Sequence, residues 1–124
     1  MMQYTLVNLK DNMKLIFFSL IGITISFQAL ALGAISAKVI QVRIDQDGRG
    51  MVSFDQPVGG SPATCVNAAY TSALAFTSSS GGGKSIMAMA LTAKATGATI
   101  TAYGTGTCSI YSTYVEDWSY GVIQ

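Results

Sequence analysis

The stretch SSSGGGKS, residues 78–85, contains the residue types of a phosphate-binding loop. In such a loop, backbone N–H groups hold the phosphates, the lysine contacts the outer phosphates and the hydroxyl binds Mg²⁺. The full pattern begins with a glycine, and this chain has Ser78 at that position. A hydrophobic strand ending in an aspartate for the metal is also missing. We therefore expect no nucleotide at Lys84, and we predict that Ser85 or Gly83 caps a helix instead.

Groups that could support catalysis are scarce. The chain has no histidine, so a Ser-His-Asp triad is impossible. A zinc site would have to be built from two cysteines and carboxylates alone. Glu116 and Asp117 are adjacent, and on a strand they would point to opposite faces. Such an arrangement does not favour acid–base chemistry that needs both carboxylates at one substrate. The sequence predicts a protein that is not an enzyme, with no metal and no cofactor.

Aromatic residues near the C-terminus form the richest candidate for a ligand site. They are interleaved with Glu116 and Asp117. Sugar sites combine an aromatic platform with hydrogen-bonding side chains, so this mixture fits a glycan. The alternative for each aromatic residue is packing in the core or at its rim. The candidate ligand-binding residues are Tyr111, Tyr114, Asp117 and Trp118, with Tyr120 beside them.

The N-terminal segment has the pattern of a secretory signal peptide. Lys10 and Lys14 precede an uncharged run over residues 15–27. The alternative, a membrane anchor, needs about 20 apolar residues, more than this run contains. Ala29 and Ala31 then supply the small residues of a cleavage site. We predict a signal peptide over residues 1–31 and a secreted or periplasmic protein.

Two details of processing stay open. Cleavage after Ala34 is the second choice, and Met13 is a possible true start because Met13-Lys14 begins an ordinary signal peptide by itself. The remaining residues 32–124 are predicted to form one domain in which basic and acidic side chains balance. A nucleic-acid partner, which calls for a basic surface, is not expected. After cleavage we expect no membrane span.

Both cysteines, Cys65 and Cys108, lie in the exported part. In an oxidising compartment, two cysteines predict one disulfide bond. Closing the long loop between them stabilises the fold by about 4 kcal/mol in the chain-entropy description. The bond would compensate for the small core of a short domain.

Alternating apolar and polar residues predict the strands. Residues 38–45 alternate like a half-buried strand, with a face formed by Ile40, Val42 and Ile44. Asp47-Gly48 signals a hairpin turn, and the alternation resumes over residues 51–54. A third strand can run from Cys65 to Phe76. Beyond the helix, strands are expected with faces formed by Ala98, Ile100 and Ala102, and by Trp118, Tyr120 and Val122.

A helix is predicted between the third and fourth strands, over residues 84–96, with Gly97 just after its end. Its outward face carries small residues instead of the usual charged ones. That face is either exposed without consequence, simply buried, or packed against a neighbouring helix, and its candidate interface residues are Ala88, Thr92 and Ala95.

The predicted order is strand, strand, strand, helix, strand, strand. This order is typical of the OB-fold, a small five-stranded barrel with a helix between the third and fourth strands. A ferredoxin-like layout is the alternative, and it needs two crossover helices. The fold class is therefore predicted as mainly β with one helix, an OB-fold-like barrel with one disulfide bond.

The segment FTSSSGGGKSIMAMALTAKATGATITAYGTGTC, following an N-terminal hairpin in a small exported domain, resembles the OB-fold B subunits of pentameric bacterial toxins. The likeness is to the subtilase-cytotoxin and pertussis-like group and covers about residues 36–107. It departs from that group in its helix composition and in the spacing of Cys65 and Cys108.

The resemblance implies a non-catalytic module that binds a cell-surface glycan, forms a ring homo-oligomer such as a pentamer, and accompanies a catalytic A-type subunit. The alternative is a small structural or interaction protein of the periplasm or cell surface with no sugar ligand.

Overall fold

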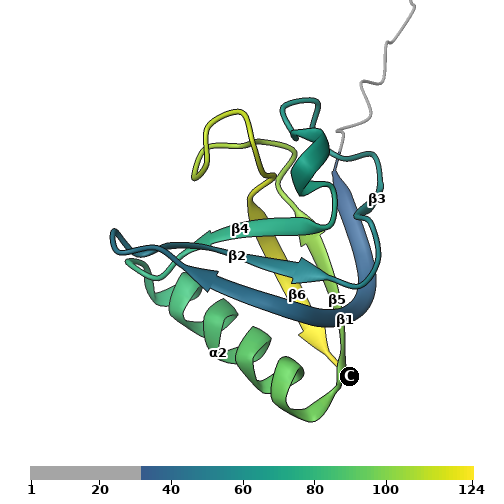
Figure 1. Ribbon diagram of the computed structural model, residues 1–124, viewed down its shortest axis with the longest axis vertical. Coiled ribbons are helices and arrows are strands. Elements are labelled where there is room, and N and C mark those ends of the chain that lie inside the picture. Colours follow the sequence, from purple (N-terminus) through teal and green to yellow (C-terminus); the bar gives the residue numbers. More distant parts are fainter. Residues whose placement is uncertain (1–31) are drawn as a thin grey trace, which may run out of the picture.

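The computed structural model describes residues 32–124. The predicted signal peptide over residues 1–31 and the possible start at Met13 lie outside the described residues. The chain folds as a bent antiparallel sheet with a single long helix packed on one side (Figure 1). Nowhere in residues 32–124 is a helix long and apolar enough to cross a membrane.

The sheet has six strands, in the order β4-β2-β1-β5-β6, with β3 paired to β1 beside this path. The five longer strands and the helix follow one another along the chain as predicted, and the two-residue β3 is additional. The strands are β1 (Gly33–Ile44), β2 (Arg49–Phe54), β3 (Gly59–Gly60), β4 (Ala73–Thr77), β5 (Thr99–Gly104) and β6 (Trp118–Ile123).

The sheet is open, which corrects the prediction of a barrel. β4 and β6 are its two edges, and a single parallel bridge connects Ala75 of β4 to Asp117, the residue before β6. A barrel needs a hydrogen-bonded ladder between its first and last strands. The coarser prediction of a mainly β fold with one helix is confirmed.

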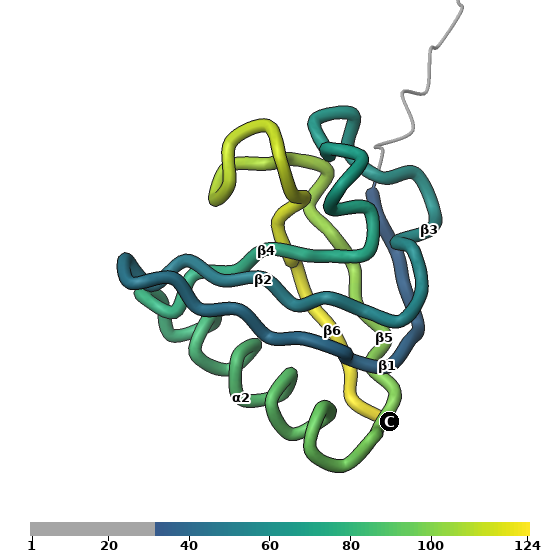
Figure 2. Tube along the Cα trace, in the orientation of Figure 1, coloured from purple at the N-terminus to yellow at the C-terminus, as the bar shows by residue number. Residues whose placement is uncertain are grey.

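β1 is long and bends, because a bulge falls between Val39 and Gln41. Its first half pairs with β5 and its second half with β2 (Figure 2). The bulge changes which side chains face the core, so Val39 is buried while Ile40 is 54% exposed. The predicted face is therefore only partly correct, because Val42 packs against the core whereas Ile40 and Ile44 are exposed. The hairpin at Asp47-Gly48 is confirmed.

The third long strand is shorter than predicted. Residues between Cys65 and Ser72 form a loop with a 3-10 helix, Ala68–Tyr70, capped by the Asn67 side chain. Asn and Ser compete with strand formation by bonding to nearby backbone groups, which explains why the ladder starts only at β4. β4 is buried on both faces, since helix-side and loop-side neighbours cover it.

The helix α2 (Gly81–Thr96) begins earlier than predicted. Ser80 is its N-cap and accepts a hydrogen bond from the Gly83 N–H, so neither Ser85 nor Gly83 is the cap. A Cβ atom on Gly83 would come within 1.6 Å of the Thr77 carbonyl oxygen, whereas one on Gly81 or Gly82 would meet nothing within 4 Å. Gly97 ends the helix at φ 71°, as predicted.

Two groups of buried side chains stabilise the domain. The larger lies between the sheet and α2 and includes Phe54, Leu74, Phe76 and Ile100. The smaller lies on the other side of β2 and β4, under the loop that precedes β6, and includes Met51, Ala75 and Val115. The second group supports the polar site described below.

The predicted disulfide bond between Cys65 and Cys108 is present. It links the loop before β4 to the loop before β6, two segments separated by 43 residues in sequence. The backbone N–H of Asn67 also donates to the Tyr114 carbonyl oxygen at 2.8 Å. These two links hold the loops together on one side of the sheet.

Candidate functional site

A cavity with a volume of about 400 Å³ lies between the β1–β2 hairpin and the two disulfide-linked loops. A volume near this value suits a small ligand. We call it the tyrosine–arginine cavity, and its lining residues are Arg43, Asp45, Arg49, Met51, Tyr70, Tyr111, Ser112 and Tyr114.

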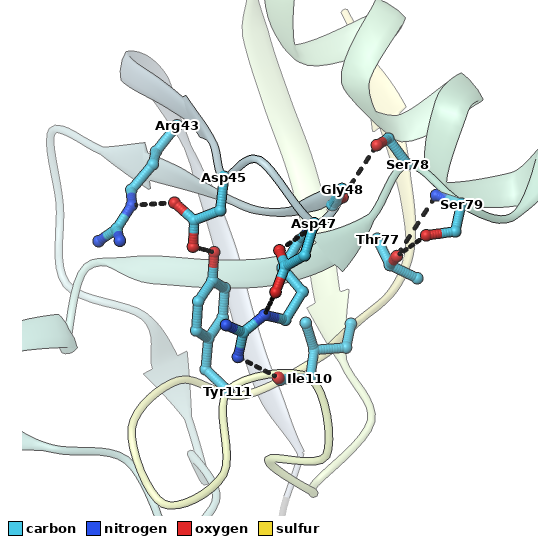
Figure 3. Close-up of polar contacts among 10 residues, drawn as sticks. Arg43, Asp45, Asp47, Gly48, Thr77, Ser78, Ser79, Ile110 and Tyr111 are labelled. Carbon is cyan, nitrogen blue, oxygen red and sulfur yellow. Dashed lines mark hydrogen bonds and ion pairs between the residues drawn. The ribbon is translucent and has the colours of Figure 1, made fainter.

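The hairpin supplies the charged side of the cavity. Arg43 Nε donates to Asp45 Oδ1 at 2.7 Å, and Arg49 Nε donates to Asp47 Oδ2 at 2.6 Å (Figure 3). Side chains on one face of a strand recur at every second position, so Arg43 and Asp45 project to the same side. Asp47 is not part of the lining, which therefore carries two positive charges and one negative charge.

Tyr111 lies at the centre of this arrangement. Its hydroxyl donates to Asp45 Oδ2 at 2.5 Å, and the guanidinium carbons of Arg43 and Arg49 lie 5.9 and 4.9 Å from its ring centroid. Cation–π attraction operates at such distances. Tyr111 thus connects the hairpin to the loop before β6 (Figure 3).

The ionisation of these groups follows from their contacts. The hydrogen bond from the Tyr111 hydroxyl, followed by that from Arg43, holds the pKa of Asp45 below its ordinary value. Burial, followed by the bond to Asp45, raises the pKa of Tyr111 to about 12. At neutral pH the carboxylate is therefore charged and the phenol keeps its proton, which is the state that sustains the bond between them.

The arginines have unused donors. In the part of the chain that the structure describes, the Nη atoms of Arg43 have no hydrogen-bond partner. Arg49 Nη1 makes one long contact, 3.5 Å, to the Ile110 carbonyl oxygen. Because a guanidinium presents five N–H donors, most of these groups remain available to a ligand with acceptor oxygens.

Two further tyrosines form the aromatic side of the cavity. Tyr70 and Tyr114 contact each other edge to face, with ring centroids 6.3 Å apart. Tyr114 is 51% exposed, so its ring is accessible from solvent. It lies in a tight turn closed by a bridge between Tyr111 and Val115, in which Thr113 has a positive φ of 67°. Such a conformation is unfavourable for a β-branched residue.

The structure brings together only half of the predicted ligand-binding residues. Tyr111 and Tyr114 line the cavity, whereas Asp117 and Trp118 do not. Trp118 is in the core, with its ring centroid 6.0 Å from that of Phe54. Tyr120 and Val122 are exposed on β6, because a bulge at Ser119 of β6, opposite Tyr103 and Gly104, places Trp118 on the other face. The prediction that all three share a face was wrong.

Asp117 is 5% exposed and lies under the cavity rather than in it. Its carboxylate accepts hydrogen bonds from the N–H groups of Ser109 and Ile110, at 2.9 and 3.1 Å, and from the hydroxyls of Ser109 and Thr107. These bonds fix the loop that carries Tyr111. Asp117 therefore positions the cavity without lining it.

Sequence reasoning missed the hairpin residues Arg43, Asp45 and Arg49, and also Tyr70. The signal was present, because Arg43 and Asp45 occupy the polar face of a strand followed by a tight turn. What the pattern did not reveal is that a loop from the other end of the chain covers this face.

The remaining predicted residues lie elsewhere. Ala88, Thr92 and Ala95 are exposed on α2, away from the cavity. Lys84 is also exposed at the start of α2, and Ser78 is engaged with the Gly48 carbonyl oxygen at the tip of the hairpin. No group of three or more His, Cys, Asp or Glu side chains within residues 32–124 could hold a metal ion.

Comparison with known proteins gives no assignment. No family model matches the chain, and neither a curated protein nor a solved structure matches it significantly.

Proposed function

We propose that this chain is an exported, non-catalytic module that binds a sugar bearing an acidic group in the tyrosine–arginine cavity. The observation that carries the proposal is the meeting of Tyr70 and Tyr114 with guanidinium groups whose N–H donors are unused. A pyranose ring has an apolar face that packs on aromatic rings. A carboxylate or sulfate on the same sugar would accept charge-assisted hydrogen bonds from the arginines.

A non-catalytic role is supported by the state of the paired carboxylates. Glu116 and Asp117 are both buried, and each accepts several hydrogen bonds from the backbone. A general acid or base must reach the substrate. Neither carboxylate lines the tyrosine–arginine cavity.

The OB-fold remains our proposal for the architecture. It is supported by the strand order, by the position of α2 between β4 and β5, and by the parallel bridge between Ala75 and Asp117 that draws the two edge strands together. The OB-fold is described as a partly open barrel, so an open sheet of this order is compatible with it.

The proposal includes a ring assembly through α2, on the helix face of Ala88, Thr92 and Ala95. The Thr92 hydroxyl donates to the Ala88 carbonyl oxygen at 2.8 Å, so its polar group is used within the helix. Leu91 nearby is 51% exposed. A face of small and apolar groups supports close packing with a second copy. A cell-surface glycan and a catalytic A-type subunit are the proposed partners.

Binding can be tested with two probes that differ in one group. We expect methyl β-D-glucuronide to bind more tightly than methyl β-D-glucoside by about tenfold or more, since one hydrogen bond to a charged group is worth about 1.5 to 3 kcal/mol. Titrations followed by NMR chemical shifts would measure both affinities. Arg49→Gln should remove the preference, while Lys84→Gln, which removes an exposed charge outside the cavity, should leave it unchanged.

The alternative is a structural or interaction protein without a sugar ligand. The exposed side chains of Tyr120 and Val122 on β6 favour it, because they offer an apolar surface unrelated to the cavity. If neither glycoside binds at millimolar concentration, and a panel of immobilised acidic glycans also gives no signal, the sugar proposal is wrong and this alternative is preferred.

A further inference from the structure

Glu116 is a carboxylate enclosed at the point where β1 begins and β5 ends. Its side chain is 1% exposed. Its two oxygens accept the Gly33 N–H, each at 3.1 Å, and Oε1 also accepts the Gly106 N–H at 2.9 Å. A Cβ atom on Gly33 or Gly104 would come within 2.1 or 2.4 Å of this side chain. Backbone therefore closes around the carboxylate on several sides.

Within residues 32–124, no cationic side chain forms an ion pair with this buried carboxylate. Among residues 32–124, the ion pairs are Arg43–Asp45 and Arg49–Asp47. A small cavity of about 210 Å³ beside Glu116 contains no other ionisable group, and its remaining lining residues are Val58, Pro62, Ala63, Val66, Thr71 and Ala73. The neighbouring Asp117 is also buried and negative, so a nearby cation would be favourable.

The peptide group between Leu32 and Gly33 is held on both sides. The Ser61 N–H donates to the Leu32 carbonyl oxygen at 3.0 Å, while the Gly33 N–H donates to Glu116. Covalent geometry keeps the Leu32 nitrogen within about 3.7 Å of the Gly33 nitrogen. The Leu32 nitrogen therefore lies within about 7 Å of the Glu116 oxygens, by the same geometry.

Processing would change the charge at this nitrogen. Hydrolysis of the Ala31–Leu32 peptide bond by an export peptidase, with water as co-reactant, leaves a carboxylate on Ala31 and an α-ammonium on Leu32. We propose that Glu116 is the counter-charge of this α-ammonium, so that removal of the leader supplies the cation that the fold lacks. The inference depends on cleavage after Ala31 and is independent of the sugar proposal.

This arrangement would make folding sensitive to export. Before cleavage the Leu32 nitrogen is a neutral amide, and Glu116 is held by backbone donors alone. After cleavage, charge attraction between the α-ammonium and the Glu116 carboxylate is added. The domain would gain stability only once the leader is gone, which suits a chain that must cross a membrane before it folds.

The test compares free and acetylated N-termini in a double-mutant cycle. The processed protein is purified from the periplasm of an expression host, and one half is N-acetylated. We expect acetylation to lower the melting temperature by about 5 °C in the wild-type chain and by much less in Glu116→Gln. Any effect of modified lysines would persist in Glu116→Gln, so the variant is the matched control.

A second measurement keeps the test valid if Glu116→Gln does not fold. NMR titration of the wild-type chain should give the Leu32 α-amine a pKa above the ordinary range of about 7.7 to 8.0. Equal melting temperatures for free and acetylated wild-type protein would overturn the proposal, as would an α-amine that titrates in the ordinary range. A mature N-terminus at a residue other than Leu32, found by mass spectrometry, would overturn it as well.

Discussion

Tyr111 and Trp118 belong to the same C-terminal segment and are almost equally buried, with 8% and 6% of their surfaces exposed. Their neighbours differ. Tyr111 is surrounded by two arginines and bonded to Asp45, whereas Trp118 packs in the core against Phe54. Trp118 Nε1 has no hydrogen-bond partner within the described residues. Burial alone does not distinguish a binding residue from a core residue, but the polarity of the surroundings does.

The largest effect is expected at Trp118. Truncation by Trp118→Ala should lower the free energy of unfolding by about 3 to 5 kcal/mol, because it leaves a large cavity between the sheet and α2. Urea titration followed by circular dichroism measures this loss. Trp118→Phe should cost much less, since it keeps a ring and removes an indole N–H that has no partner. A small loss for Trp118→Ala would contradict the core assignment.

Asp117 precedes Trp118 in the sequence and holds the loop that carries Tyr111. Its substitution should have the next largest effect on the free energy of unfolding. In Asp117→Asn, one acceptor oxygen becomes an NH₂ group that faces the N–H donor of either Ser109 or Ile110, since these two donors bond to different oxygens. We expect a loss of about 2 kcal/mol, as for hydrogen bonds to a buried charged group. Hydrogen exchange should increase in the loop over residues 107–111 but not in α2. Unchanged exchange in that loop would show that Asp117 does not position the cavity.

Tyr111→Phe removes one hydrogen bond and should cost about 1 kcal/mol near neutral pH. Its pH dependence is more informative. The pKa of Tyr111 is raised to about 12 in the folded chain, so its contribution is complete below about pH 10, the unfolded value, and is lost as pH rises towards 12. Unfolding titrations across this range should bring wild type and Tyr111→Phe together. If the stabilities of the two proteins differ by the same amount at every pH, the assignment of the hydrogen bond between Tyr111 and Asp45 is wrong.

Asp45, which accepts the same hydrogen bond, contributes a pH dependence of stability with the opposite sign. The pKa of Asp45 is lowered in the folded state, so its contribution is present above the ordinary value of 3.8 and is lost as pH falls through the folded value. In Asp45→Asn, the free energy of unfolding should therefore decrease less steeply as pH falls below 3.8 than in the wild-type chain. Acid titration of both chains, followed by circular dichroism, measures the difference.

The smallest effect on stability is expected at Tyr114. Its side chain is half exposed, so Tyr114→Ala should change the free energy of unfolding by less than about 0.5 kcal/mol while weakening glycoside binding. Tyr120→Ala is the matched control, because Tyr120 is 58% exposed on β6, outside the cavity. If Tyr114→Ala and Tyr120→Ala bind the glycoside with equal affinity, Tyr114 does not contact the ligand in the cavity.

The sequence was most informative where a regular pattern meets a defined turn. Local residue preferences predicted the hairpin at Asp47-Gly48, the end of α2 at Gly97 and the face of Ile100 and Ala102. The expectation of an oxidising compartment predicted the disulfide bond between Cys65 and Cys108. The bulges in β1 and β6 could not be predicted from the sequence, because an extra residue in a ladder depends on the partner strand.

The candidate site depended on contacts between distant segments. Tyr111 and Asp45 are separated by 66 residues, and nothing in the local pattern of either segment indicates the other. An aromatic cluster in sequence predicted two of the cavity tyrosines, and it also included a core tryptophan. The spacing of residues in the sequence predicts which side chains share a face of a strand. To predict a cavity, one must also know which distant segment covers that face.

The contact of Gly83 with the Thr77 carbonyl oxygen also affects how relatives should be sought. Of the three glycines in the GGGKS stretch, only Gly83 is required sterically, since Gly81 and Gly82 have free space around them. The stretch that most resembles a nucleotide-binding motif can therefore drift in two of its three glycine positions while the fold is retained. A more durable fingerprint would join Gly83 to Gly33 and Gly104, the two glycines that enclose Glu116, because a Cβ atom at any of these three positions would collide with atoms of another residue.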